Sequence, residues 1–63
     1  MSYKQNLIKQ LTLRVADLDK ATSTKTVYSV EGLDEEQTLV LLENLVLGLT
    51  KKFFAQRKSR RNA

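Results

Sequence analysis

The sequence contains no cysteine and no histidine among its 63 residues. These absences exclude disulfides and the usual zinc sites. They also remove the most common base near neutral pH and the most reactive nucleophile, and the chain has no glycine-rich phosphate loop. We therefore expect a protein that is not an enzyme, with no catalytic residues, no metal site, no cofactor and no small-molecule substrate.

Long apolar runs are also missing. The longest, residues 39–49, is interrupted by Glu43, Asn44 and Gly48 and falls short of the roughly 20 residues of a membrane span. No apolar run follows a charged N-terminus, so we expect no signal peptide. The sequence predicts a soluble, cytoplasmic protein without a transmembrane segment, and the lack of cysteine fits a reducing compartment.

The small size of the chain has a consequence for its assembly. A domain of this length buries only about 60% of the surface that its unfolded chain exposes. Small domains compensate with disulfides, a metal or oligomerisation. Because the first two are excluded, the sequence predicts self-association into a dimer or a larger assembly.

The first half of the chain shows a period-two pattern. Leu7, Leu11, Leu13 and Val15 occupy odd positions, with mainly polar residues between them. This alternation is typical of a strand with one buried face. Residues 17–23 are rich in turn formers, and residues 24–30 are rich in β-branched and aromatic residues, which favours a second strand. The two strands are expected to pair as an antiparallel β-hairpin.

A helix over Lys4–Leu18 is the alternative for the same stretch. Leu7, Leu11 and Leu18 can share one helical face, to which Ile8 and Val15 would add. The alternation favours the hairpin, and the helix stays open as the second interpretation.

The second half predicts one long helix. Gly32 can form the corner before it. Asp34 is placed as the N-cap, with Gln37 three residues later, which is the pattern of a capping box. No proline follows, so the helix can continue to about Arg57 or Arg60.

Together these elements predict an α+β fold, in which a small β-hairpin is followed by one long C-terminal helix (ββα). Homodimerisation is expected to complete it, and two hairpins can join edge to edge into four strands. The predicted divisions are a flexible N-terminus at 1–6, a single ββα domain at 7–56 and a basic tail at 57–63.

The predicted helix carries more apolar surface than a hairpin can cover. One sector faces the core and contains Leu39, Leu41, Leu42, Leu45, Val46, Leu49 and Phe53. A second stripe has seven-residue spacing and contains Val40, Leu47 and Phe54. A helix of this length measures about 36 Å, whereas a seven-residue strand measures about 23 Å. We therefore predict a self-association or partner interface formed by Val40, Leu47, Phe53 and Phe54.

Charge is divided unevenly along the chain. Residues 1–50 carry five cations and seven anions, whereas residues 51–63 carry six cations and no anion. Such a basic end predicts binding of nucleic acid through phosphate contacts. The residues expected to make these contacts are Lys51, Lys52, Arg57, Lys58, Arg60 and Arg61. No helix-turn-helix, zinc finger or aromatic stacking platform is evident, so sequence-specific reading is not predicted.

Two other functions remain open. The chain has the features of a small regulator, adaptor or inhibitor of the kind made by phages and other mobile elements. Such a protein would bind its partner through the exposed apolar face of the helix, and the basic end would steer it to an acidic protein surface. Residues 51–61 can also be interpreted as a segment that lies on an anionic membrane.

Overall fold

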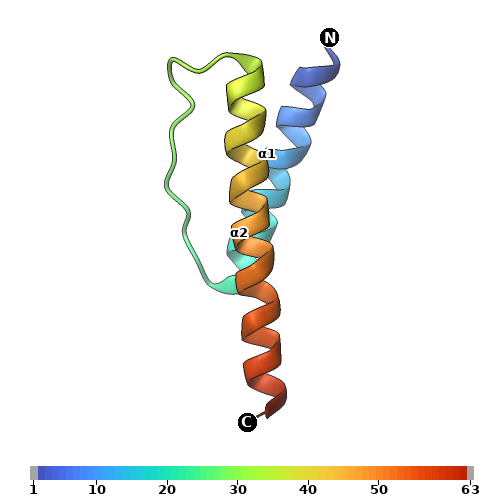
Figure 1. Ribbon diagram of the computed structural model, residues 1–63, viewed down its shortest axis with the longest axis vertical. Coiled ribbons are helices and arrows are strands. Elements are labelled where there is room, and N and C mark those ends of the chain that lie inside the picture. The colour runs from blue at the N-terminus through green and yellow to red at the C-terminus, as the bar shows by residue number, and fades with distance from the viewer. Residues whose placement is uncertain (1, 63) are drawn as a thin grey trace.

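The computed structural model describes residues 2–62, and the side chains of residues 2–58. It contains two α-helices: α1 spans Tyr3–Thr22, and α2 spans Glu35–Asn62 (Figure 1). No strand is present in residues 2–62. The fold is therefore all-helical, and the predicted ββα arrangement with its β-hairpin is wrong.

The two helices lie side by side and run in the same direction. At one end the Ser2 hydroxyl donates a hydrogen bond to the Glu35 carboxylate over 3.2 Å. At the other end the Gln56 amide donates to the Thr22 carbonyl oxygen over 3.1 Å. The connection between the helices must therefore return along the length of the molecule, and Figure 1 shows it doing so beside α2. The molecule is elongated and measures 46 × 20 × 15 Å.

The predicted first strand lies inside α1. Its inward residues are Ile8, Leu11, Val15 and Leu18, which follow the three- and four-residue spacing of a helix face. Leu13, which the alternation placed in the core, is 59% exposed. The helical interpretation of this stretch is therefore the correct one, and the helix is longer at both ends than Lys4–Leu18.

The predicted second strand and the loop before it also differ. Residues 17–22, expected to form a loop, are the last turns of α1, and residues 24–30 are irregular, without a partner strand. Asp19 fixes the start of this connection, because its carboxylate accepts hydrogen bonds from the Thr26 amide over 2.9 Å and from the Thr26 hydroxyl over 2.6 Å. The first of these bonds satisfies the Thr26 backbone amide, which in a β-sheet would bond to a neighbouring strand.

Side chains and turns define the helix ends. The Ser2 hydroxyl caps α1 by accepting from the Gln5 amide over 3.1 Å, so part of the N-terminus expected to be flexible forms the first turn. Ser23 ends α1 in the left-handed region at φ 54°. Gly32, at φ 79°, forms the corner before α2, which is the role predicted for it.

The predicted capping box at the start of α2 is confirmed. The Gln37 amide donates to the Asp34 carboxylate over 2.7 Å, and the Asp34 amide donates to the Gln37 side-chain oxygen over 3.2 Å. Both bonds satisfy donors that the first helical turn leaves without partners.

Loss of this cap gives a first testable prediction. Asp34→Ala should lower the free energy of unfolding by about 1 kcal/mol, because the Gln37 amide loses its acceptor. Urea unfolding followed by circular dichroism at 222 nm measures the effect. Asp34→Asn is the matched control, since asparagine also accepts at an N-cap and should remain within a few tenths of a kcal/mol. Equal losses in the two variants would show that the cap is not the cause.

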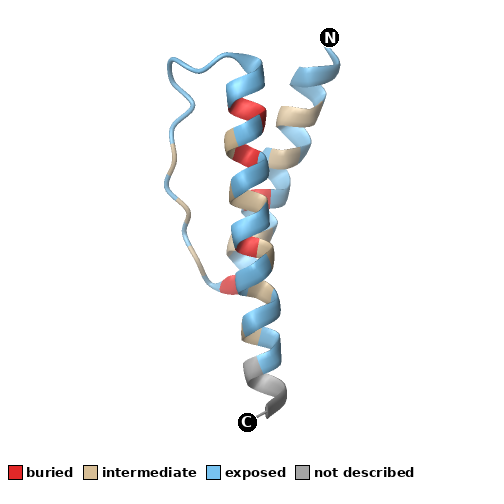
Figure 2. Ribbon diagram, in the orientation of Figure 1, coloured by how far each residue is buried: buried red, intermediate tan, exposed pale blue. Residues whose placement is uncertain are grey.

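The core lies between the two helices and is small. Val15 from α1 and Leu42 and Leu49 from α2 are its buried centre, with Tyr28 of the connection packed against it. Figure 2 shows the buried positions, in red, on both helices. The inward sector predicted for the long helix is confirmed, since each of its seven residues is buried or half-buried. A helix covers this sector, however, in place of a sheet.

The molecule exposes much surface for its mass. Its accessible surface is 5226 Å², whereas a folded monomer of 7.2 kDa is expected to expose about 4,100 Å². Its radius of gyration is 13.4 Å, compared with about 10.6 Å for a compact domain of this length. About 1,100 Å² of surface is therefore exposed beyond that of an average monomer.

Candidate interaction surface

The side of α2 that faces away from α1 carries three large apolar side chains. Val40 is 55% exposed, Leu47 is 61% exposed and Phe54 is 60% exposed. A seven-residue spacing keeps side chains on nearly the same side of a helix. The buried Leu42 and Leu49 follow Val40 and Leu47 by two residues, which places them about 200° further round. The apolar stripe is thus close to the opposite side of α2 from the core.

Charged and polar residues complete this surface. Glu36 and Glu43 lie on its N-terminal half, whereas Lys51 and Lys58 lie on its C-terminal half, and all four are exposed. We call the whole surface the outer face of α2; it consists of Glu36, Val40, Glu43, Asn44, Leu47, Lys51, Phe54 and Lys58. Its charge changes sign near Leu47.

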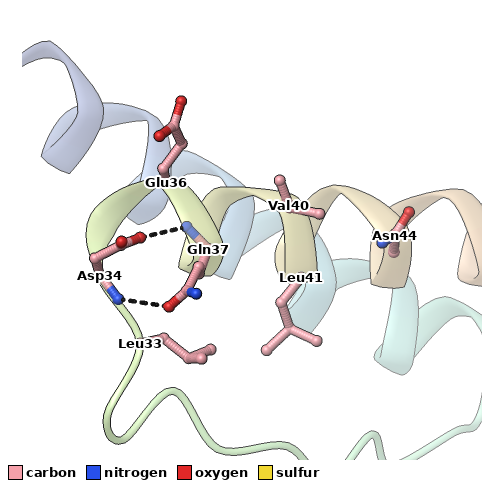
Figure 3. A pocket seen from close by; sticks show the side chains of 7 residues that line it. All are labelled: Leu33, Asp34, Glu36, Gln37, Val40, Leu41 and Asn44. Atoms are coloured by element: carbon pink, nitrogen blue, oxygen red, sulfur yellow. Dashed lines mark hydrogen bonds between the residues drawn. The ribbon is translucent and has the colours of Figure 1, made fainter.

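A shallow depression of about 600 Å³ lies at the start of the outer face (Figure 3). Leu33, Val40 and Leu41 supply its apolar wall, and polar side chains supply its rim. The complete lining is Leu33, Asp34, Glu36, Gln37, Val40, Leu41 and Asn44. The capping box holds the rim in place, since Asp34 and Gln37 are bonded to each other there. The depression can receive an apolar group from outside the chain.

Phe53 differs from the other three residues of the predicted interface. It is half-buried, and its ring lies beneath the Arg57 guanidinium, 5.6 Å from the ring centroid. The Phe54 ring meets it edge-on at 5.8 Å between centroids. The structure therefore brings Val40, Leu47 and Phe54 together on the outer face, while Phe53 belongs to the inner side and supports Phe54.

The four predicted phosphate-binding cations whose side chains are described do not form one patch. Lys51 and Lys58 lie on the outer face, whereas the Lys52 ammonium donates to the Thr24 hydroxyl over 2.7 Å. Arg57 stacks on Phe53. Arg60 and Arg61 belong to the last turns of α2, but their side chains lie outside the described part. The four described cations therefore lie on several sides of the helix.

Other kinds of site find little support in the geometry. The described residues contain no group of three acidic side chains placed to hold a metal ion. Neither helix, over its described residues, combines the length and the apolar character needed to cross a membrane.

Leu33, Leu41 and the two outer-face glutamates were missed as site residues from the sequence. The glutamates could have been found by placing charged residues on the same helical wheel as the apolar stripe. Leu33 could not, because its position depends on the corner at Gly32.

No protein-family model matches the chain, and neither a curated protein nor a solved structure is significantly similar to it. The function must therefore be inferred from the surface of this chain alone.

Proposed function

We propose that the protein is a non-enzymatic binding protein whose basic helix end contacts the phosphates of nucleic acid. The observation that carries this proposal is the projection of α2 beyond α1. Gln56 is level with Thr22, the last residue of α1, so residues 57–62 continue past it as helix (Figure 1). Four cations and no acid lie in this projecting segment.

The charge of this segment exceeds what the helix itself requires. Cations near a helix C-terminus are stabilised by the helix dipole, but only within about the last turn. Four of the six cations in residues 51–61 precede that turn, which ends at Asn62; they are Lys51, Lys52, Arg57 and Lys58. A high density of cations along one helix end attracts polyanions and releases their counterions on binding. The contacts expected are to phosphate, which gives binding that depends weakly on sequence and strongly on salt.

A shortened chain tests this proposal. A protein that ends at Gln56 keeps the Gln56–Thr22 hydrogen bond and loses Arg57, Lys58, Arg60 and Arg61. We expect its affinity for duplex DNA to fall. The slope of log K against log salt concentration should become shallower by up to about 3.6, which corresponds to the loss of four phosphate contacts. Titrations of duplex and single-stranded DNA and RNA over a salt series measure both quantities.

The matched control removes four cations from α1. Lys4, Lys9, Arg14 and Lys20 are exposed, and their joint replacement by glutamine gives the same loss of charge at another place. This control should retain most of the salt slope. If the control and the shortened chain lose affinity equally, net charge and not the helix end is responsible. Unchanged affinity in the shortened chain would exclude the proposal.

A second candidate function is binding of a protein through the outer face of α2. The exposure of Val40, Leu47 and Phe54 favours it, because large apolar side chains aligned on one face commonly mark an interaction site. An apolar helix face of this kind fits a groove on a partner. Leu47→Glu should then abolish partner binding while the helical circular dichroism signal is retained.

A further inference from the structure

We infer that the outer face of α2 binds the same face of a second copy of this chain, with the two helices antiparallel and crossing near Leu47. This inference does not depend on nucleic-acid binding. It identifies a partner, an orientation and a register for a surface that the chain itself leaves uncovered.

The chain as a whole exposes more surface than one stable interface needs. The chain exposes 5226 Å², about 1,100 Å² beyond the expectation for its mass. Stable interfaces bury about 800 Å² on each partner. A second copy is the simplest occupant, because a two-fold interface uses one surface twice.

The charges of the outer face determine the orientation. Glu36 and Glu43 lie on its first half and Lys51 and Lys58 on its second half. A parallel pair would bring like charges together, which is unfavourable. An antiparallel pair brings the acids of one copy to the cations of the other, so the outer face is complementary to itself.

The positions of these residues determine the register. In an antiparallel pair, residues equally distant from the centre face each other across the two-fold axis. With Leu47 at the centre, Val40 faces Phe54 of the second copy, seven residues on either side. Glu43 and Lys51 are each four residues from the centre, and Glu36 and Lys58 are each eleven residues from it. Apolar residues therefore meet apolar residues, and acids meet cations.

The shape of the surface supports the same register. Phe54 projects from one end of the outer face, and the depression beside Leu33, Val40 and Leu41 lies at the other end. In the antiparallel pair each Phe54 ring is directed toward the depression of the second copy. The acidic rim of the depression, at Asp34 and Glu36, then lies near the basic end of the second helix.

Gly48 follows Leu47 in the sequence but points about 100° away from it, so it lies beside the outer face. A glycine inside a helix costs about 1 kcal/mol relative to alanine. Within its own chain nothing lies within 4 Å of the position that a Cβ would take, so packing inside the chain does not require glycine there. The pairing does not require glycine at this position either, since Gly48 is not part of the outer face.

A charge exchange tests the inference. Sedimentation equilibrium of the full chain, without nucleic acid and at low salt, should show a monomer–dimer equilibrium. Glu43→Lys and Lys51→Glu should each weaken the dimer roughly ten-fold, because each creates two like-charged pairs. The double variant, Glu43→Lys with Lys51→Glu, should return to near the original dissociation constant. Asp17→Lys, an equal change of charge on the exposed side of α1, is the control and should have little effect.

Each outcome of this experiment is informative. Restoration by the double variant supports the antiparallel register, whereas single variants without effect would exclude it. A monomer at all concentrations would show that a different protein, or none, occupies the outer face, and would overturn the inference. Leu47→Glu gives an independent check, since it should abolish the dimer while helical circular dichroism of the monomer is retained.

Discussion

Replacing Leu42 with alanine should cost about 2–5 kcal/mol of the free energy of unfolding, which is the usual range for a leucine removed from a core. Leu42 is only 1% exposed and is the largest fully buried side chain in the described part of the chain. A domain of 63 residues has a total stability of roughly 3–9 kcal/mol. The variant should therefore be largely unfolded or have a much lower midpoint in urea.

Urea and thermal unfolding, followed by circular dichroism, measure this effect. The matched control is Leu13→Ala, which makes the same chemical change at a leucine that is 59% exposed. The control should change stability by no more than about 0.5 kcal/mol, as exposed substitutions usually do. Equal losses at Leu42 and Leu13 would mean that the core does not lie between the helices as described.

Leu13→Pro should break α1 and lower stability by about 3 kcal/mol or more. Leu13 lies in the middle of Tyr3–Thr22, where proline removes a backbone hydrogen bond and clashes with the preceding turn. Because the leucine side chain is exposed, little of the loss can be due to packing. Loss of helical signal at 222 nm together with the lower urea midpoint measures the effect.

Two further changes at the same position separate a helix from a strand. Leu13→Ala and Leu13→Glu should both be tolerated, because the side chain points to solvent. In a β-hairpin, Leu13 would share the buried face with Leu11 and Val15, and glutamate there would be severely destabilising. A severe loss in Leu13→Glu would therefore contradict the helical fold.

The sequence predicted α2 well because its signals agree with one another. The capping pair Asp34–Gln37 marks the start of the helix, the seven inward residues and the exposed stripe follow from its period, and the structure contains all three. The helix also extends beyond the rest of the chain as expected, but only after Gln56, which is level with Thr22; Phe53, which was expected in the uncovered part, is half-buried. α2 has 28 residues and α1 has 20, a difference of about 12 Å in length.

The first half of the chain could not be assigned from local pattern alone. Leu11 and Val15 fit both the alternation with Leu13 and the helical face with Ile8 and Leu18. What decides between them is the partner, since the inward face of α2 packs against a helical ridge in the folded chain. The β-branched segment at residues 24–30 has a strand composition but no strand beside it, so its propensity has no effect on the fold.

The interaction surface was predicted in part for the same reason. Val40, Leu47 and Phe54 were expected to be exposed because helical spacing fixes their direction. The depression next to them was not, because it needs Leu33 to be positioned by a turn at Gly32. Features within one helix can be predicted from sequence, whereas features that join two elements depend on tertiary structure.

The parallel arrangement of the helices has a consequence for the speed of folding. The hydrogen bonds that join the two ends of the helix pair connect residues 33 and 34 positions apart. In an antiparallel helix pair, contacts near the turn close short loops first, and the others follow in sequence. In this protein a contact at either end of the helix pair must close a loop of 33 or 34 residues. No contact between the helices is therefore short-range, and none has a head start. The protein should therefore fold more slowly than a two-helix chain with a short turn. Its stability, in contrast, should depend little on the length of the connection, since doubling a loop costs only about 0.6 kcal/mol.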